Sequence, residues 1–588
     1  MTLPKDRIRQ WLYFIYSQKE ASWLQEAIAQ RIRVFREDHP TKGPPHPLHQ
    51  LLTQRDAILI TYGDQFQQPG QPHLRTLARF LDDHLRDVLD GVHILPFFPY
   101  SSDDGFSVID YKQVDPALGD WRDIARLKQR GYRLMFDAVI NHISRESAWF
   151  QGFVRGEKPY RDYFIVVDPL ADFSQVVRPR ALPLLTPVET SEGVKHVWTT
   201  FSSDQVDLNY ANPQLALEII DVLLFYAAQG AQIIRLDAIA YLWKEQGASC
   251  IHLPKTHAMV KLWRAIFDAV APDVLLITET NVPHQENISY FGDYLPETGK
   301  TDEAQLVYNF TLAPLTLHAF LSGDARKLSR WAATLEAPPG ATFFNFIASH
   351  DGIGVRPAEG VLSPEEMQAL VDRTLAHGGQ VSYKANPDGS RSVYELNATL
   401  YDLLNDPAHP NLEEDVARFL ASQSILLSLA GVPGVYVHSL FGSRNCHACY
   451  EQTGRERSLN REKFDLDAVE TRLADPHSHQ ARVFAGYRKM LKVRRQLPAF
   501  HPFAGQTILE GNPAIFAVLR TAPDESQRVL CLTNVSSQPQ SFRLPSGGWK
   551  NVFSGEVVGA DVISLAGFGW AWLQNTRHPT KNLYLTTG

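Results

Sequence analysis

The stretch "GAQIIRLDAIAYLW", residues 230 to 243, places two charged side chains inside an otherwise apolar segment. Its β-branched residues predict a short buried strand over residues 231 to 239. Arg235 and Asp237 occupy alternate positions of this strand, so their side chains leave it on the same side. Because an unpaired buried charge costs several kcal/mol, the two residues form either a structural ion pair or part of a chemical site.

Similar segments recur along the chain, and each is followed by an amphipathic segment of helical length. Together with residues 231–239 they are residues 58–64, 92–99, 132–141, 274–281, 306–310, 342–351 and 434–440. Alternation of strand and helix favours parallel strand pairing, and eight such units close into a barrel. We therefore predict an α/β fold, a (β/α)8 barrel.

Two long insertions and two flanking regions complete the predicted organisation. Residues 1–50 are expected to form a helical extension and linker, residues 51–498 the barrel, and residues 499–588 a small β-sandwich. The insertions cover about residues 145–206, after the third strand, and about residues 352–410, after the seventh. Long insertions on the catalytic rim of a barrel usually form lids and acceptor sites.

Polar residues gather at the carboxyl ends of the predicted strands, the rim that carries the active site in such barrels. They are Asp64, Asp137, Asn141, Asp237, Glu279, His350 and Asp351. Taken alone, any one of these aspartates is explained equally well as the N-cap of the helix after its strand. That explanation does not account for five strands that end alike.

Asp237 and Glu279 follow successive strands, so their carboxylates can flank one bond. Glycosidic cleavage needs this arrangement: one carboxylate attacks the sugar while the other, kept protonated, donates to the leaving oxygen. A separation of roughly 5 to 5.5 Å would indicate a covalent intermediate and retention. Arg235 is placed to hold the nucleophile ionised, and Asp351 to bind sugar hydroxyls.

Composition narrows the remaining classes of function. The chain has 588 residues and a net charge of −8, which argues against a nucleic-acid-binding surface. No run approaches the roughly 18 apolar residues of a membrane helix, and residues 1–18 lack the apolar region of a signal peptide. We therefore expect a cytoplasmic protein that binds neither nucleic acid nor membrane. Of the four cysteines, two form "CHAC" at 446–449; we expect reduced, partly buried thiols.

Four motifs, "DAVINH", "IIRLDAIAY", "TETN" and "FIASHDG", resemble the signature regions of the α-amylase superfamily of retaining glycoside hydrolases, glycoside hydrolase family 13. The resemblance covers nearly the whole chain from about residue 50. It implies Asp237 as nucleophile, Glu279 as general acid/base and Asp351 as transition-state stabiliser. It also implies a subsite for the cleaved glucose that contains His142, Arg235 and His350.

Within that superfamily, "GVHILPFFPYSSDDGFSVIDY", "HDGIGV", "GGQVSYKANPDGS" and "SLFGSRN" resemble the sucrose phosphorylase group, which acts on sucrose, sucrose 6'-phosphate, glucosylglycerol or glucosylglycerate. This resemblance implies Asp64 and Arg461 as ligands of the glucose and Arg180 as a phosphate contact. Tyr111 stands where classical sucrose phosphorylases have a histidine, which points away from sucrose itself. Lys384, in the second insertion, is expected to favour an anionic acceptor.

The expected activity is therefore the reversible, retaining transfer of a glucosyl group from a small α-glucoside to phosphate. The resemblance implies inorganic phosphate as co-substrate, no metal or organic cofactor, and a monomer or homodimer. Two alternatives remain. One is an α-glucosidase or transglucosidase, disfavoured by the insertion that carries Arg180. The other is a catalytically silent carbohydrate-binding relative, disfavoured because Asp237, Glu279 and Asp351 are all present.

Overall fold

In the part of the chain that the computed structural model describes, residues 3–40, 44–386 and 390–576, eight parallel strands close into a barrel. The strands follow the chain order, and the first pairs with the last. They are β1 (Ile58–Thr61), β3 (Gly91–Ile94), β4 (Arg133–Ala138), β9 (Ile233–Leu236), β10 (Leu275–Thr278), β13 (Leu306–Asn309), β14 (Thr342–Asn345) and β18 (Val432–Tyr436). The predicted fold class is confirmed.

Most strands are shorter than the apolar segments that predict them, because the chain turns at the rim of the barrel. The last segment shows this most clearly. The predicted strand over 434–440 ends at Tyr436, and its second half forms the short helix α15 (Val437–Phe441). A glycine inside β18 allows close packing there: a Cβ at Gly434 would lie 2.5 Å from the Phe344 ring.

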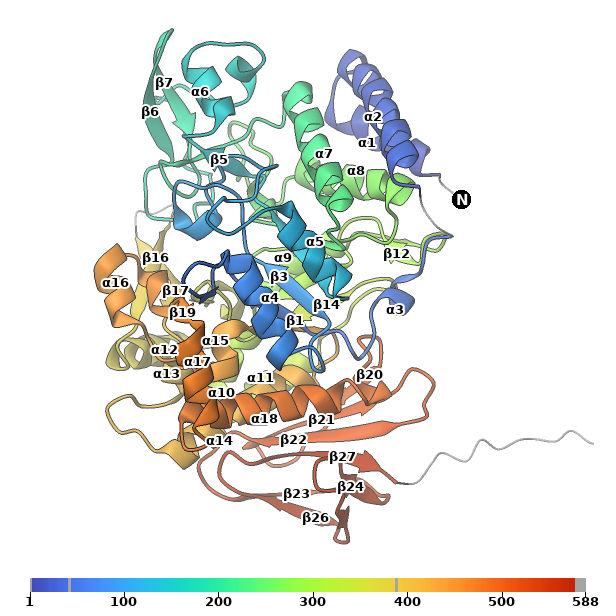
Figure 1. Cartoon of the computed structure of the whole chain (residues 1–588), viewed down its shortest axis with the longest axis vertical. Helices are drawn as coiled ribbons and strands as arrows, with labels where there is room; N and C mark the ends of the chain where they lie inside the picture. Colours follow the sequence, from blue (N-terminus) through green and yellow to red (C-terminus); the bar gives the residue numbers. More distant parts are fainter. Residues whose placement is uncertain (1–2, 41–43, 387–389, 577–588) are drawn as a thin grey trace, which may run out of the picture.

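Helices surround the barrel and cover its strands (Figure 1). They are α4 (His73–His84), α5 (Trp121–Gln129), α7 (Pro213–Ala228), α8 (Pro254–Val270), α9 (His284–Ile288), α10 (Leu312–Ser322), α11 (Arg326–Ala332), α14 (Leu412–Ser428) and α18 (His479–Arg494). The bounds of α7 follow from its sequence. The Asn212 side chain accepts hydrogen bonds from the first turn, Pro213 opens the helix, and Gly230 at φ +105° turns the chain into β9.

Two further helices at the amino end, α1 (Pro4–Ile15) and α2 (Gln18–Asp38), pack on the outside of this layer (Figure 1). Arg7 of α1 forms a buried ion pair with Asp268 of α8, at 2.8 Å. Arg31 of α2 binds both carboxylate oxygens of Asp221 on α7, at 2.6 and 2.9 Å. A short helix, α3 (Leu48–Leu51), leads into β1. None of the helices in the described residues is both long and apolar enough to span a membrane.

The two insertions rise from the catalytic rim. The first contains β5 (His142–Ser144), α6 (Ala148–Val154), the hairpin β6 (Leu185–Thr190) with β7 (Gly193–Trp198), and β8 (Gln205–Asp207), which pairs with β5. The second contains β15 (Ile353–Gly354), α12 (Pro364–Ala376), β16 (Gln380–Ala385), β17 (Arg391–Asn397) and α13 (Leu400–Leu404). Strands β15, β17 and β16 form one antiparallel sheet over the rim.

A loop after β18 carries α16 (His447–Thr453) and returns to the rim through a 3-10 turn, η6 (Glu456–Asn460). Our expectation of free thiols in "CHAC" was wrong, because Cys446 and Cys449 are joined by a disulfide. The first turn of α16 brings their Cα atoms to 5.2 Å, within the range that a disulfide spans. The other two cysteines, Cys250 and Cys531, are free and buried.

The carboxyl-terminal region is antiparallel. Its larger sheet joins β20 (Gly505–Ile508), β21 (Ile515–Thr521), β22 (Arg528–Asn534), β27 (Trp570–Asn575), β24 (Trp549–Asn551) and β25 (Val557–Val558), and its smaller sheet joins β23 (Gln540–Arg543) and β26 (Val562–Leu565). Figure 1 places both sheets beneath α18, on the side of the molecule away from β6 and β7 of the first insertion.

Two buried arginines lie where this region meets the base of the barrel, and both donate to main-chain oxygens. Arg494 of α18 donates to the main-chain oxygens of Gln54 and Gly431, at 2.9 and 3.3 Å. Arg520 of β21 donates to the oxygen of Ser428 at 3.0 Å, and also to those of His501 and Gly505. Burial lowers the pKa of the Arg520 guanidinium to about 10. The carbonyl groups at the end of α14 therefore supply the negative ends of dipoles that stabilise the charge.

We expect Arg520→Met to lower the free energy of unfolding by roughly 3 kcal/mol, because several buried carbonyl groups lose their donor. Calorimetry or a thermal melt followed by circular dichroism measures this as a melting temperature lower by several degrees. Arg528→Met, at an exposed position of the neighbouring strand β22, is the control and should change stability by less than about 0.5 kcal/mol. Equal melting temperatures for the two variants would contradict the assignment.

Candidate active site

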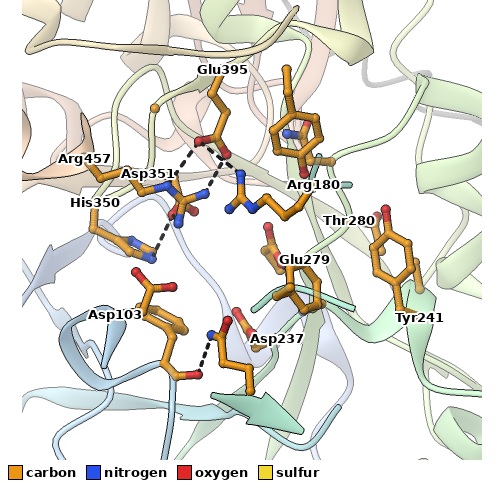
Figure 2. A pocket seen from close by; sticks show the side chains of 18 of the residues that line it. Asp103, Arg180, Asp237, Tyr241, Glu279, Thr280, His350, Asp351, Glu395 and Arg457 are labelled. Carbon is orange, nitrogen blue, oxygen red and sulfur yellow. Dashed lines mark hydrogen bonds and ion pairs between the residues drawn. The ribbon is translucent and has the colours of Figure 1, made fainter. Parts of the chain in front are cut away.

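A cavity opens at the carboxyl ends of the barrel strands. Its floor comes from the strand ends and its upper walls from the two insertions and the loop after β18 (Figure 2). Of the residues that the sequence predicts for the site, those that line this cavity are Asp237, Glu279, Asp351, His142, His350 and Arg180. The structure therefore brings together side chains from five separate parts of the chain.

Arg235 lies directly beneath the floor, with its side chain 1% exposed. The parallel register of β4 and β9 sets Asp137 beside it, and the two side chains form an ion pair. The guanidinium also donates to Asp237 at 2.7 Å, while His93 contacts the second oxygen of Asp137 at 2.6 Å. The two charges in the apolar strand thus compensate each other within a buried network.

The carboxylates of Asp237 and Glu279 lie side by side on the cavity floor (Figure 2). Arg235 is 2.7 Å from Asp237 and 3.8 Å from Glu279. Glu279 also accepts a hydrogen bond of 3.0 Å from the backbone N–H of Ala238. That residue adopts a left-handed conformation, φ +49°, which turns its N–H toward the neighbouring strand end.

The pKa values of both carboxyl groups are raised. For Asp237 the main cause is burial, which Arg235 opposes and Asp137 reinforces. For Glu279 the main cause is again burial, opposed by Arg235 and reinforced by the charges of Asp237 and Asp351. Because Arg235 hydrogen-bonds Asp237 and only approaches Glu279, it favours ionisation of Asp237 more strongly. The pair is thus built to share one proton, which rests on Glu279.

Asp351 is held as a carboxylate on the opposite side of the floor. Burial alone would raise its pKa, but the positive charges of Arg457 and Arg461 hold the pKa well below its usual range. Arg457 makes the closest contact, 2.6 Å, and His350 approaches to 3.6 Å (Figure 2).

Two neutral imidazoles complete the lower wall. Burial lowers the pKa of both His142 and His350, so each presents a neutral ring to the cavity at neutral pH. His142 contacts the main-chain oxygen of Phe106 at 2.8 Å, and the Phe106 ring stacks on His350 with centroids 4.9 Å apart. Neutral imidazoles and a flat apolar face suit the polar edge and apolar face of a sugar ring.

Arg461 and Asp64 lie beside the cavity, outside its lining. Arg461 donates to the main-chain oxygen of His350 at 2.8 Å and pairs with Asp104 at 2.7 Å. Asp64 is paired with Lys463 at 2.7 Å, and that ammonium lies 3.6 Å from the centroid of the Tyr62 ring. Arg461 also reaches two residues of the lining, Asp103 at 3.3 Å and Asp351 at 3.8 Å.

The structure does not bring Tyr111 or Lys384 to the cavity. Tyr111 is buried, and its hydroxyl donates to the main-chain oxygens of Val139 and His142, so it supports the loop that carries His142. Lys384 extends from β16 and pairs with Glu359 at 3.3 Å. Residues 387–389 of the turn beyond it lie outside the described residues.

Sequence reasoning missed several residues that line the cavity. They are Asp103, Gln205, Tyr241, Tyr394, Glu395 and Arg457. None lies at a barrel strand end, so the pattern of polar strand ends carries no signal for them. The sequence carries a weak signal for Arg457, because this residue precedes Arg461 by one helical turn in "RERSLNR". Among the described residues there is no group of three or more His, Cys, Asp or Glu side chains arranged to hold a metal ion.

Comparison with known proteins agrees with this architecture. The family model for the α-amylase catalytic domain matches residues 83–351. A solved structure, sucrose 6F-phosphate phosphorylase from Thermoanaerobacter thermosaccharolyticum, superposes with a TM-score of 0.69 at 25% identity, covering 82% of this chain and 94% of that one. The barrel with this rim defines a protein of the α-amylase family.

Curated relatives define the group more closely. Glucosylglycerate phosphorylase from Spirochaeta thermophila is 50% identical over 589 residues, covering 97% of this chain and 98% of that protein. Glucosylglycerate phosphorylase from Escherichia coli is 42% identical over 537 residues, covering 89% and 94%. The chain belongs to the sucrose phosphorylase group of glucoside phosphorylases within the α-amylase family.

We expect Asp237→Asn to lower the pKa of Glu279 by on the order of 1 pH unit, because it removes a neighbouring negative charge. Infrared difference spectra across a pH titration measure this through the band of the protonated carboxyl group. Asp64→Asn makes the same change of charge outside the cavity and should leave the titration unchanged. A Glu279 titration that does not move in Asp237→Asn would show that the two groups do not share a proton.

Proposed function

We propose that this chain cleaves an α-glucoside of glycerate with inorganic phosphate, releasing α-glucose 1-phosphate and glycerate. The observation that carries the proposal is the near full-length similarity, 50% over 589 residues, to a glucosylglycerate phosphorylase. The cavity supports it chemically, since three carboxylates lie on the floor and two arginines, Arg180 and Arg457, lie above them.

In the first half of the reaction, Asp237 is the nucleophile and Glu279 the general acid. An oxygen of Asp237 forms a bond to the anomeric carbon while the glycosidic bond breaks. The proton of Glu279 passes to the departing oxygen, so glycerate leaves with a free hydroxyl group. The raised pKa of Glu279 keeps that proton available, and Arg235 keeps Asp237 ionised for attack.

In the second half, a phosphate oxygen attacks the anomeric carbon of the β-glucosyl-enzyme and the ester to Asp237 breaks. Glu279, now a carboxylate, accepts the proton of the attacking hydrogen phosphate and so becomes the acid again for the next cycle. Formation of the ester removes the charge of Asp237, which lowers the pKa of Glu279 and suits it to its second role. Two inversions give net retention. Asp351 stabilises the positive charge that develops on the sugar in both steps.

The acceptor part of the cavity is suited to an anion. Arg180 reaches it from the first insertion with its side chain 23% exposed and its guanidinium 5.2 Å from the centroid of the Tyr394 ring. Both glycerate and phosphate are anions at neutral pH, so one cationic region serves both halves of the reaction. Lys384 pairs with Glu359 outside the cavity, so in this proposal Arg180 is the cation that binds the acceptor anion.

The direct test incubates the protein with phosphate and, in separate reactions, glucosylglycerate, glucosylglycerol, sucrose and sucrose 6'-phosphate. We expect glucose 1-phosphate from glucosylglycerate, at a kcat/KM at least about 100-fold above that with glucosylglycerol and sucrose, because the charged partner is lost with their neutral acceptors. Release of free glucose at the same rate without phosphate would instead identify a glucosidase, and a preference for another donor would refute the glycerate assignment.

Two donors with different leaving groups distinguish the roles of Asp237 and Glu279. Asp237→Asn should abolish turnover of every substrate, because an amide does not form the glycosyl ester. Glu279→Gln should lose about 10³-fold or more with glucosylglycerate but much less with α-glucosyl fluoride, whose fluoride leaves without a proton. Steady-state kinetics with both donors measure the difference. Equal losses of the Glu279→Gln variant on both donors would remove Glu279 from the acid role.

A further inference from the structure

Glu395 is a carboxylate in the acceptor part of the cavity that the proposed mechanism does not use. It lies on β17 of the second insertion, lines the cavity and is 3% exposed. Figure 2 shows Arg457 and Arg180 directed toward it from opposite sides. A negative charge in a region that receives anions calls for a physical explanation.

The two arginines contact Glu395 in different ways. Arg457 makes a bidentate contact with it, at 2.6 and 3.1 Å, while its remaining nitrogen contacts Asp351 at 2.6 Å. Its donors are therefore committed to fixed partners. Arg180 approaches Glu395 only to 3.9 Å, an ion pair too long for a hydrogen bond. Arg180 thus keeps donors for a ligand while its charge is partly balanced by Glu395.

A double-displacement phosphorylase needs an arginine whose charge is only partly balanced, because one anion must leave the acceptor region before another enters it. Glycerate departs while the glucosyl-enzyme persists, and phosphate then occupies the same space. An arginine without any counter-charge would hold the departing glycerate and slow the exchange. A buried carboxylate near the arginine weakens the binding of every anion there in proportion to the charge of that anion.

We propose that Glu395 is a specificity-determining residue that competes with the acceptor anion for Arg180 and so sets the affinity of the acceptor subsite for phosphate relative to glycerate. The inference rests on the proposed function, since it assumes that both anions occupy this subsite. Arg457 also bridges Glu395 to Asp351 on the floor, so the KM of a neutral acceptor is needed to separate an effect on the acceptor anions from an effect on the sugar.

The charge relation makes the expected effect specific. Glu395→Gln removes one negative charge but keeps an oxygen that accepts a hydrogen bond from Arg457. The Coulomb repulsion between Glu395 and a dianion is twice that between Glu395 and a monoanion at the same place. When the charge is removed, the factor by which the affinity for phosphate rises is therefore the square of the factor for glycerate. We expect the KM for glycerate to fall about 3-fold and the KM for phosphate about 10-fold. The KM for glycerol, a neutral acceptor, should stay unchanged.

The experiment measures KM for phosphate with glucosylglycerate as donor, and KM for glycerate and for glycerol with glucose 1-phosphate as donor. Glu359→Gln is the matched control, since it makes the same change of charge on the same insertion, in a residue that pairs with Lys384 outside the cavity. It should leave all three KM values unchanged. Glu395→Asp keeps the charge and should leave the KM values for phosphate and glycerate close to those of the unmodified protein. A fall in either KM with this variant would overturn the inference even if the glutamine variant does not fold.

The outcomes distinguish the inference from the function on which it rests. If the unmodified protein forms no glucose 1-phosphate from glucosylglycerate and phosphate, the proposed function fails. If the unmodified protein does form it, three results with Glu395→Gln would overturn the inference. They are a higher KM for both anions, a change in the KM for glycerol by the same factor, and unchanged KM values for phosphate and glycerate. If Glu395→Asp reproduces the effect of Glu395→Gln, charge is not the cause and the inference is likewise overturned.

Discussion

The site depends on one buried cation. Arg235 stands in the middle of a barrel strand, where a charge without partners would destabilise the fold, and it is tolerated because Asp137 and Asp237 accept its hydrogen bonds. The same contacts decide the chemistry, since they keep one floor carboxylate ionised while leaving the other far enough away to hold a proton. The contacts that balance the buried charge of Arg235 are thus the same contacts that keep Asp237 ionised for the reaction.

The two halves of the cavity have opposite electrostatic character and different origins. The barrel strands supply the floor, which is rich in carboxylates and rigid because each residue follows a hydrogen-bonded strand. The insertions and the loop after β18 supply the arginines above it. A positively charged sugar in the transition state thus faces the floor, and anionic acceptors face the loops. Variation in the loops can change the acceptor without disturbing the chemistry on the sugar.

The sequence predicted the part of the molecule that follows a regular pattern. Eight apolar segments alternating with helices define the barrel, and residues such as Asp237 and Glu279 lie at the rim because the strands place them there. Tyr111 and Lys384 show where this reasoning ends, since a motif position does not tell which way a loop side chain points. Glu395 and Arg457 could not be predicted, because they reach the cavity through an antiparallel sheet and a 3-10 turn whose placement depends on packing far along the chain. The disulfide of Cys446 and Cys449 was missed for a similar reason: composition alone does not show how tightly a turn brings two thiols together.

Closure of the barrel by pairing of β1 with β18 also has a consequence for how the protein is made. Residues 58–61 leave the ribosome early, but one edge of that strand has no neighbour until residues 432–436 have been synthesised. Throughout this interval an apolar strand edge, open to pairing with other chains, is present on the nascent polypeptide. The many contacts between distant parts of the sequence make the final closure slow. Production of the protein at high yield should therefore depend on molecular chaperones and on moderate rates of translation more than on the stability of the finished fold.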